Sequence, residues 1–383
     1  MTVYLDNSAT TRPSEPVRET VNRHMQSGWY NPSALYKPAM EIQKEINAVR
    51  EKCLNAADAA GERIVFTSGG TEADNLALIG HMKTHRQPRR VLISSVEHPA
   101  VSSCREVIEG LGHRVEEIPA GPEGHIDLEK LENMTDETVA LISVMQVNNE
   151  TGIIEPLKEI AGIRDRKSPC AGIHVDGVQG FLRVPFSMKA IGVQSYAISA
   201  HKIQGLKGTG ALILKKDWRI RPIQFGGGQE ENLRSGTENT FGIIALGEAV
   251  STYDIEANKR VEKLRKQLEQ LLKEAVPDVV INSPTMIHDA CAPHILNAAF
   301  PPVRSQTMLF ALEGDGIYVS AGSACASRKQ KISPVLKAMG IRQEIADCSL
   351  RFSLSPETTE DEIAYAAERT AFHWNLLRKY TRR

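Results

Sequence analysis

A lysine flanked by a serine and a histidine, and followed by a glycine-rich loop, is the part of this sequence best suited to covalent chemistry. Lys202 ends the segment Ser199-Ala200-His201-Lys202, which directly follows the apolar, strand-like run 195–198. A lysine that forms a Schiff base must be held at one point on a rigid element, and hydroxyl and imidazole groups beside it can bind a phosphate. These residues therefore indicate a Schiff-base lysine at a phosphate-bearing cofactor.

A glycine turn earlier in the chain is suited to holding that phosphate. The run Thr-Ser-Gly-Gly-Thr-Glu at 67–72 follows an apolar strand-like segment and precedes a helical pattern. Free backbone amides and the helix dipole at such a turn point at an anion, so Gly70 and Thr71 would grip the phosphate. Taken alone, the same run is equally explained as an ordinary helix start capped by Thr71 and Asp74.

Polar side chains also follow three other strand-like runs. His98 could stack on a planar pyridine ring, and Asn149 could bind a phenolic oxygen or a substrate carboxylate, although Asn149 also suits a simple turn. Asp176 ends a buried apolar run, where a bare carboxylate is costly unless it caps a helix or meets a cation such as a protonated pyridine nitrogen. Gln179, three residues later, could reach the phenolic oxygen.

Bulk composition excludes several classes of function. The chain has 383 residues, which suggests two domains, and its net charge of -1 gives no electrostatic case for binding nucleic acid or a membrane. Six scattered cysteines without a CxxC pair argue against a structural zinc site and against a disulfide scaffold. No secretory signal or membrane-spanning run is visible, so we expect no metal and a reducing, cytoplasmic setting.

Short apolar runs alternate with longer helical patterns through the first two thirds of the chain. This alternation is typical of an α/β fold with a largely parallel, helix-covered sheet, in which ligands bind beyond the carboxyl ends of the strands. The expected strands are 63–67, 90–94, 139–144, 172–176 and 210–214, and the expected helices include 72–82 and 156–166.

A charged segment with helical periodicity, 255–272, predicts a long helix between two domains. Beyond it, the runs 298–300, 316–320 and 349–353 predict strands of a smaller α+β unit. We therefore expect a large cofactor-binding domain at 14–255, and a small domain made of 1–13 and 256–383.

The order of these pieces resembles the class V aminotransferase superfamily of fold type I enzymes. The match runs from Leu5-Asp6-Asn7-Ser8-Ala9-Thr10-Thr11 to Arg351-Phe352-Ser353. The resemblance implies a large domain with a mostly parallel seven-stranded sheet covered by helices, a smaller α+β domain, and pyridoxal 5'-phosphate as cofactor. It also implies that Lys202 carries the cofactor, Asp176 pairs its ring nitrogen, Gln179 bonds its phenolic oxygen, His98 stacks on its ring, and Thr71, Ser199 and His201 hold its phosphate.

The run Val-Ser-Ala-Gly-Ser-Ala-Cys-Ala-Ser at 319–327 places one cysteine, Cys325, among small residues. Such neighbours favour a flexible loop carrying a nucleophile, although a small buried thiol in a tight turn would also fit. This run, together with 225–237, resembles the group I (NifS/IscS-like) cysteine desulfurases. That resemblance implies a homodimer that converts L-cysteine to L-alanine and leaves a persulfide on Cys325. It further implies that His98 acts as acid or base, Thr237 reaches the other subunit's cofactor phosphate, and Asn31 and Arg351 bind the substrate carboxylate.

The resemblance leaves the sulfur acceptor open. Better-known members continue beyond the residues that match 372–377, and that tail contacts an iron–sulfur scaffold protein. Sulfur could therefore go to iron–sulfur assembly, or to tRNA or cofactor thiolation. Two other readings stay open: a selenocysteine lyase or another class V aminotransferase-like enzyme, and a non-catalytic protein that keeps the fold. The second is disfavoured because Lys202, Asp176, His98 and Cys325 are all present.

Overall fold

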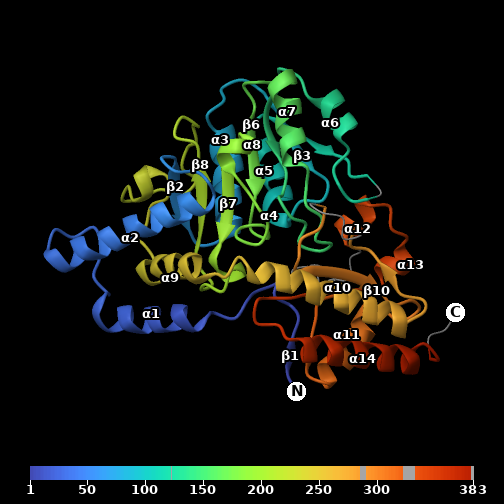
Figure 1. Cartoon of the computed structure of the whole chain (residues 1–383). Coiled ribbons are helices and arrows are strands. Elements are labelled where there is room, and N and C mark those ends of the chain that lie inside the picture. The colour runs from blue at the N-terminus through green and yellow to red at the C-terminus, as the bar shows by residue number, and fades with distance from the viewer. Residues whose placement is uncertain (122, 285–289, 322–332, 381–383) are drawn as a thin grey trace.

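The computed structural model describes residues 1–383 except 122, 285–289, 322–332 and 381–383 (Figure 1). A seven-stranded sheet with strand order β2-β8-β7-β6-β5-β3-β4 forms its centre. Four neighbouring pairs run parallel, and β8 runs antiparallel to both β2 and β7, so the sheet is mostly parallel as predicted. Its strands are β2 (Arg63–Thr67), β3 (Arg90–Ser94), β4 (Arg114–Ile118), β5 (Val139–Ser143), β6 (Gly172–Asp176), β7 (Ser195–Ser199) and β8 (Gly210–Leu214).

Helices cover both faces of this sheet, because alternate strand residues point to opposite sides. Ile64 and Phe66 of β2 belong to one apolar cluster with α2, α7 and α9, whereas Val65 belongs to a second cluster with α3 and α5. The helices of this part are α1 (Glu15–Ser27), α2 (Lys37–Ala56), α3 (Gly70–Met82), α4 (Pro99–Ser102), α5 (Cys104–Gly110), α6 (Leu128–Met134), α7 (Leu157–Lys167), α8 (Met188–Ile191) and α9 (Thr240–Thr252), with short 3-10 turns η1 (Ala200–Lys202) and η2 (Glu230–Asn232).

Most of the rest of the chain packs around a separate apolar cluster at the lower right of Figure 1, whereas α12 and α13 pack against Val96 and Ile153 of the larger part. One sheet has the order β12-β10-β9, and a two-stranded sheet pairs β1 with β11, so the first residues of the chain join the last third. Its elements are β1 (Val3–Tyr4), α10 (Ala257–Ala275), β9 (Val280–Ile281), β10 (Ile295–Ala299), α11 (Ser305–Gly314), β11 (Ile317–Tyr318), α12 (Pro334–Ala338), α13 (Gln343–Ala346), β12 (Ser349–Ser353) and α14 (Glu360–Leu377).

The α/β fold class predicted from the sequence is confirmed, and the individual elements differ in detail. The predicted run 316–320 is a strand only over 317–318, and the strand expected at 298–300 is centred earlier, at 295–299. The division of the chain at 13/14 and 255/256 stays a prediction. Among the described residues, no helix is both long and apolar enough to cross a lipid bilayer.

Candidate functional site

Three of the predicted site residues come together at the carboxyl ends of neighbouring strands. Asp176 is the last residue of β6, Lys202 ends the turn η1 that follows β7, and His98 follows β3 by four residues. The strand register pairs Asp176 with Ala197 of β7, which brings these strand ends level. All three side chains interact electrostatically, because Asp176 and Lys202 both influence the pKa of the His98 imidazole.

The amine of Lys202 is buried and held by the backbone of the N-terminal segment. Its Nζ donates to the carbonyl oxygen of Ser8 at 2.5 Å and to that of Ala9 at 2.9 Å. Burial, followed by the positive charges of Arg351 and Arg183, lowers the pKa of Lys202 to about 7. A free amine is therefore well populated at neutral pH, which is what condensation with an aldehyde requires.

The Asp176 carboxyl is almost completely buried and has a single recorded hydrogen bond. Its Oδ1 accepts from the backbone amide of Val178 at 2.9 Å. Burial raises the pKa of Asp176, while His98 and Lys202 oppose that rise. A buried carboxyl with so few donors is a suitable partner for an added cation, such as the protonated nitrogen of a pyridine ring.

His98 caps the short helix α4 with its ring. Its Nδ1 accepts a hydrogen bond from the amide of Ala100 at 3.1 Å, so the neutral ring carries its proton on Nε2. Burial lowers the pKa of His98, and Asp176 partly opposes that effect. The Nε2 proton is therefore available for exchange with a bound molecule.

A phosphate-sized anion would meet the start of α3. The first intrahelical bond there runs from Ala73 N to Gly69 O at 3.2 Å, so the amides of Gly70 and Thr71 precede the helical hydrogen-bond ladder. A Cβ on Gly70 would lie 2.4 Å from Val178 Cγ2 and 3.8 Å from Ser199 Cβ. Glycine is thus required for close approach at Gly70, and Ser199 lies beside it as the predicted phosphate site needs.

The remaining predicted cofactor ligands lie at the other side of Lys202. His201 Nδ1 lies 3.1 Å from Thr10 Oγ1, and burial lowers the pKa of His201 to about 4, so the ring is neutral. Gln179 Nε2 donates to Ser8 O at 2.9 Å, and its Oε1 accepts from Arg183 at 3.1 Å. The amide of Gln179 therefore has its nitrogen directed toward the site.

Arg351 is placed beside this constellation but is already paired. Its Nη1 donates to the carbonyl oxygen of Asn149 at 2.7 Å, and its Nη2 donates to Asp6 Oδ1 at 2.7 Å. The side chain is 1% exposed, and its Nε is buried without a hydrogen-bond partner. A substrate carboxylate would therefore have to compete with Asp6 for the guanidinium.

Two other predicted residues, Asn31 and Thr237, are exposed on the surface of the chain. Asn31 is exposed in the loop between α1 and α2, which lies at the far left of Figure 1, away from the lower end of β7. Its side chain accepts from the Ser33 amide at 2.9 Å. Thr237 is also exposed, in the segment before α9. Cys325 lies outside the described residues.

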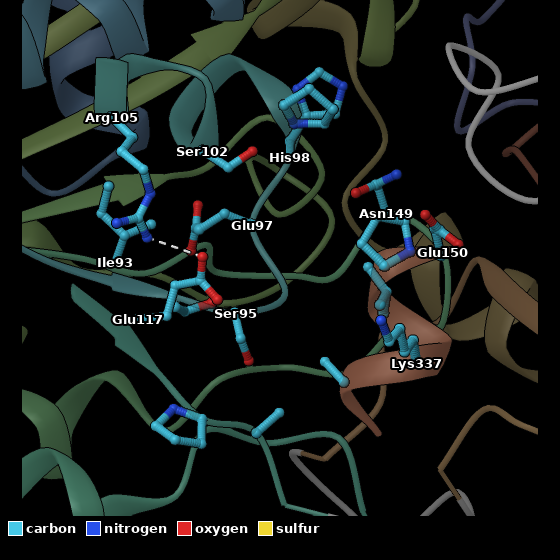
Figure 2. A pocket seen from close by; sticks show the side chains of 17 residues that line it. Ile93, Ser95, Glu97, His98, Ser102, Arg105, Glu117, Asn149, Glu150 and Lys337 are labelled. Carbon is cyan, nitrogen blue, oxygen red and sulfur yellow. Dashed lines mark hydrogen bonds and ion pairs between the residues drawn. The ribbon is translucent and has the colours of Figure 1, made fainter. Parts of the chain in front are cut away.

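A cavity of about 780 Å³ opens next to His98 and Asn149 (Figure 2). It lies between the loop after β3, the end of β4 and helix α12, and Lys202 is not among its lining residues. Charged groups surround it: the ion pair of Arg105 and Glu117 at 2.9 Å closes one side, and Lys337 of α12 lies at the other. A polar molecule can therefore approach His98 from this side.

Four residues of the site were missed by the sequence reasoning. Ser8 and Ala9 act through main-chain carbonyls, which leave no mark on side-chain chemistry. Asp6 falls in the N-terminal segment that carried the family resemblance, and that resemblance was the only signal for it. Arg183 lies four residues after Gln179, as one basic residue among 46, and nothing in the sequence distinguishes it.

The residues present fit pyridoxal phosphate on their own chemistry. Lys202 offers a buried amine with a lowered pKa, Asp176 offers a carboxyl that lacks a cation, and the start of α3 offers unpaired amides behind a glycine that tolerates no side chain. These are an aldehyde-capturing group, a partner for the ring nitrogen and a phosphate cradle, in the arrangement that one cofactor would need.

Comparison with known proteins agrees with this chemistry. The family model Aminotransferase class-V matches residues 3–365. A protein of Dictyoglomus turgidum named cysteine desulfurase IscS is 35% identical over 370 residues, covering 96% of this chain and 93% of that protein. The chain belongs to the cysteine desulfurases of the class V aminotransferase family. This is the family predicted from the sequence.

Solved structures show the same likeness. A NifS-like protein superposes on this cysteine desulfurase with a TM-score of 0.92 at 33% identity, covering 98% of this chain and 100% of that chain. A structure described as SspA in complex with cysteine has a TM-score of 0.82 at 27% identity, covering 94% of this chain and 100% of that chain. The likeness extends over both the central sheet and the unit that contains β12.

Proposed function

We propose that this cysteine desulfurase uses pyridoxal phosphate held at Lys202, and that it passes the sulfur of L-cysteine to Cys325. The observation that carries the proposal is the Lys202 amine, which is buried beside Asp176 and has a pKa lowered to about 7. When bound, the cofactor supplies an electron sink that allows the bonds at Cα and Cβ of the amino acid to be broken. Lys202, Asp176, Gln179, Ser199, His201 and the start of α3 would hold it.

Lys202 and His98 are the groups that move protons in this proposal. The Lys202 amine would take the Cα proton of the substrate, and its lowered pKa suits a base at neutral pH. His98 carries a proton on Nε2 and lines the cavity of about 780 Å³ beside Asn149. It would exchange that proton with the departing or incoming thiol.

Arg351 would bind the substrate carboxylate, with Asn149 beside it. The guanidinium is a two-pronged donor that matches a carboxylate, and its present partner is the carboxylate of Asp6. The incoming substrate carboxylate would take the place of Asp6. Substrate binding would then break the contact between Arg351 and Asp6. Only a ligand with a carboxylate can replace that contact, so the site would select for such ligands.

Transfer of sulfur from the substrate to Cys325 needs no outside oxidant. The Cys325 thiolate attacks the substrate sulfur, an S–S bond forms, and the Cβ–S bond breaks. The electron pair of the broken bond stays on Cβ, which is then protonated, and L-alanine leaves. A persulfide remains on Cys325, and a thiol of an acceptor protein or an added reductant removes its outer sulfur.

We propose a homodimer in which Asn31 and Thr237 serve the partner's site. Both residues are exposed, and the α1–α2 loop that carries Asn31 lies at the far left of Figure 1, away from the lower end of β7. Large apolar side chains are also exposed on the same part of the molecule, where an interface would cover them. These are Met25, Trp29, Leu35, Tyr36 and Met40 in and around the α1–α2 loop, and Phe225.

The decisive experiment is a comparison of Cys325→Ser with wild type and with Cys170→Ser. Cys170 is an exposed free cysteine and provides a matched control. With L-cysteine, pyridoxal phosphate and a reductant, wild type and Cys170→Ser should release sulfide and alanine in equal amounts, and Cys325→Ser should release neither. Full turnover by Cys325→Ser would refute the sulfur-carrier role.

The persulfide itself can be detected without turnover. After one equivalent of L-cysteine and no reductant, intact-protein mass spectrometry should show a gain of one sulfur in wild type, located on the peptide that contains residue 325. The same experiment with selenocysteine and with other amino acids separates a desulfurase from a selenocysteine lyase or an aminotransferase. Added acceptor proteins of the iron–sulfur and thiolation classes would then identify where the sulfur goes.

A further inference from the structure

Arg183 is a buried cation that contacts Lys202, Gln179, His294 and Tyr253. Its side chain is in the segment after β6, and the residue is 5% exposed. Nη1 donates to Gln179 Oε1 at 3.1 Å and to His294 Nε2 at 3.0 Å, and Nη2 donates to the carbonyl oxygen of Lys202. The guanidinium thus fixes the main chain of Lys202 and the side chain of Gln179 at once.

This guanidinium lacks a carboxylate partner within the described part of the chain, where none lies within 4.0 Å of it. The other deeply buried arginines do have one: Arg164 pairs with Asp165 at 2.6 Å, Arg265 with Glu269 at 3.3 Å, and Arg351 with Asp6 at 2.7 Å. Burying a cation without a counter-charge is costly. That cost indicates a role for the charge other than stability.

We propose that Arg183 is a positioning residue of the desulfurase reaction, which fixes the orientation of the Gln179 amide and keeps an uncompensated positive charge beside the Lys202 amine. This inference rests on the proposed role of Lys202 as the cofactor lysine. Arg183 would hold Lys202 and Gln179 in place without touching the reacting atoms.

The contact with Arg183 fixes which way the side-chain amide of Gln179 faces. A guanidinium can only donate, so the oxygen of Gln179 must face Arg183. The amide nitrogen then has two N–H groups on the opposite side, one of which donates to Ser8 O. Gln179 can therefore offer only a donor to a phenolic oxygen, and a donor stabilises the ionised form of that oxygen.

The positive charge of Arg183 is not cancelled by its contacts with His294 and Tyr253. His294, which precedes β10, meets Arg183 Nη1–H with Nε2, and its pKa is held well below its ordinary value by burial and by Arg183. Its ring is therefore a neutral acceptor and does not cancel the guanidinium charge. Tyr253 also contacts Arg183, and burial raises the pKa of that phenol, so it is neutral as well.

Several charged groups face Lys202, and Arg183 differs from the other cation among them. Arg351 also lowers the pKa of Lys202, but its own charge is offset by Asp6. Removing Arg183 would leave Arg351 as the other cation near the amine, opposed by Asp6 and Asp176. The titratable and charged groups that influence or contact Lys202 are Arg351, Arg183, Asp6, Asp176, His98, His201 and His294.

The test measures the Lys202 amine in the cofactor-free protein, so it does not depend on sulfur transfer. Competitive labelling with a small acylating reagent, read by mass spectrometry across pH 5–11, gives the pH midpoint of Lys202. For Arg183→Met we expect this midpoint to rise by about one unit, because a like charge has been removed. Arg164→Met, a buried arginine of α7 away from the site, should leave the midpoint unchanged.

A second variant covers the possibility that Arg183→Met does not fold. Gln179→Glu is nearly isosteric and places a carboxylate against Arg183, so the Lys202 midpoint should again rise. In the cofactor-loaded protein, the pH dependence of the visible absorbance band should shift in the same direction. An unchanged midpoint in both variants would overturn the inference. Loss of persulfide formation at Cys325, with the midpoint shift intact, would count against the proposed function alone.

Discussion

Asp6 and Arg351 are joined by a 2.7 Å hydrogen bond although 345 positions separate them in the chain. Asp6 follows β1, and Arg351 lies in the middle of β12, where its guanidinium also contacts the carbonyl oxygen of Asn149. The guanidinium proposed to bind the substrate carboxylate is therefore engaged by the carboxylate of Asp6 in this structure. In the proposed function, binding of an amino acid would exchange one carboxylate for another.

This exchange can be tested with Asp6→Asn. The variant removes the competing charge, so the KM for L-cysteine should fall severalfold while the buried guanidinium loses its counter-charge. The free energy of unfolding should drop by about 2 kcal/mol, because an unpaired buried cation is costly. Steady-state kinetics and urea denaturation of the same preparation measure both effects. A KM that rises would show that Asp6 assists substrate binding and does not compete with it.

Gly70 offers a test of the phosphate cradle. In Gly70→Ala the new Cβ would lie 2.4 Å from Val178 Cγ2, so the loop after Asp176 must move. Affinity for pyridoxal phosphate should fall at least about tenfold, equivalent to roughly 1.4 kcal/mol. The double variant Gly70→Ala/Val178→Ala removes the clash and should recover most of the affinity, whereas Val178→Ala alone should bind normally. If the double variant binds no better than Gly70→Ala, the defect does not come from this contact.

Lys202 should make the cofactor-free protein less stable at neutral pH. Its pKa is lowered from 10.5 to about 7, so between these values the unfolded chain binds more protons than the folded one. The free energy of unfolding contributed by this group therefore rises with pH across that window. Lys202→Met should be more stable than wild type by about 4 kcal/mol at pH 7, and the difference should shrink toward pH 10.5. A difference that does not change with pH would contradict the lowered pKa.

Ionisation of Glu155, outside the site, should change the free energy of unfolding with pH in the opposite direction to that of Lys202. Burial raises its pKa from 4.5 to about 8, and Oε1 has no hydrogen-bond partner, while Oε2 accepts from the Ile126 amide at 3.0 Å. The folded protein holds the extra proton in this window, so stability falls as pH rises from 4.5 to 8. Glu155→Gln should match wild type near pH 4.5 and exceed it in free energy of unfolding by about 4 kcal/mol at pH 8. Chemical denaturation at the two pH values gives the comparison.

Most strands of the large sheet could be predicted from the sequence because their residues are largely buried and apolar. The apolar runs 63–67, 90–94, 172–176 and 210–214 have the same bounds in the structure. β4 escaped prediction because Arg114–Ile118 contains three charged residues. β2 lies at the opposite edge of the sheet from β4, but four of its five residues are buried, so it still gives an apolar run that the sequence reveals.

The candidate site was predictable only in part, for a different physical reason. Asp176 and Lys202 stand at strand ends, where position along the chain already indicates position in space. The partners of Arg351 and of the Lys202 amine come from residues 6–9, and the contacts of Arg183 join segments 111 positions apart. Such contacts depend on tertiary packing and leave no local pattern in the sequence.

The position of residues 6–9 has a consequence for how the enzyme is made. The carbonyls of Ser8 and Ala9 hold the Lys202 amine, while Asp6 is tied to a strand that begins at Ser349. A ribosome must therefore release nearly the whole polypeptide before the earliest-made segment can take its native place. Capture of pyridoxal phosphate at Lys202, as proposed, would then be a late event of biosynthesis, because the Asp6–Arg351 contact cannot form before β12 has been made.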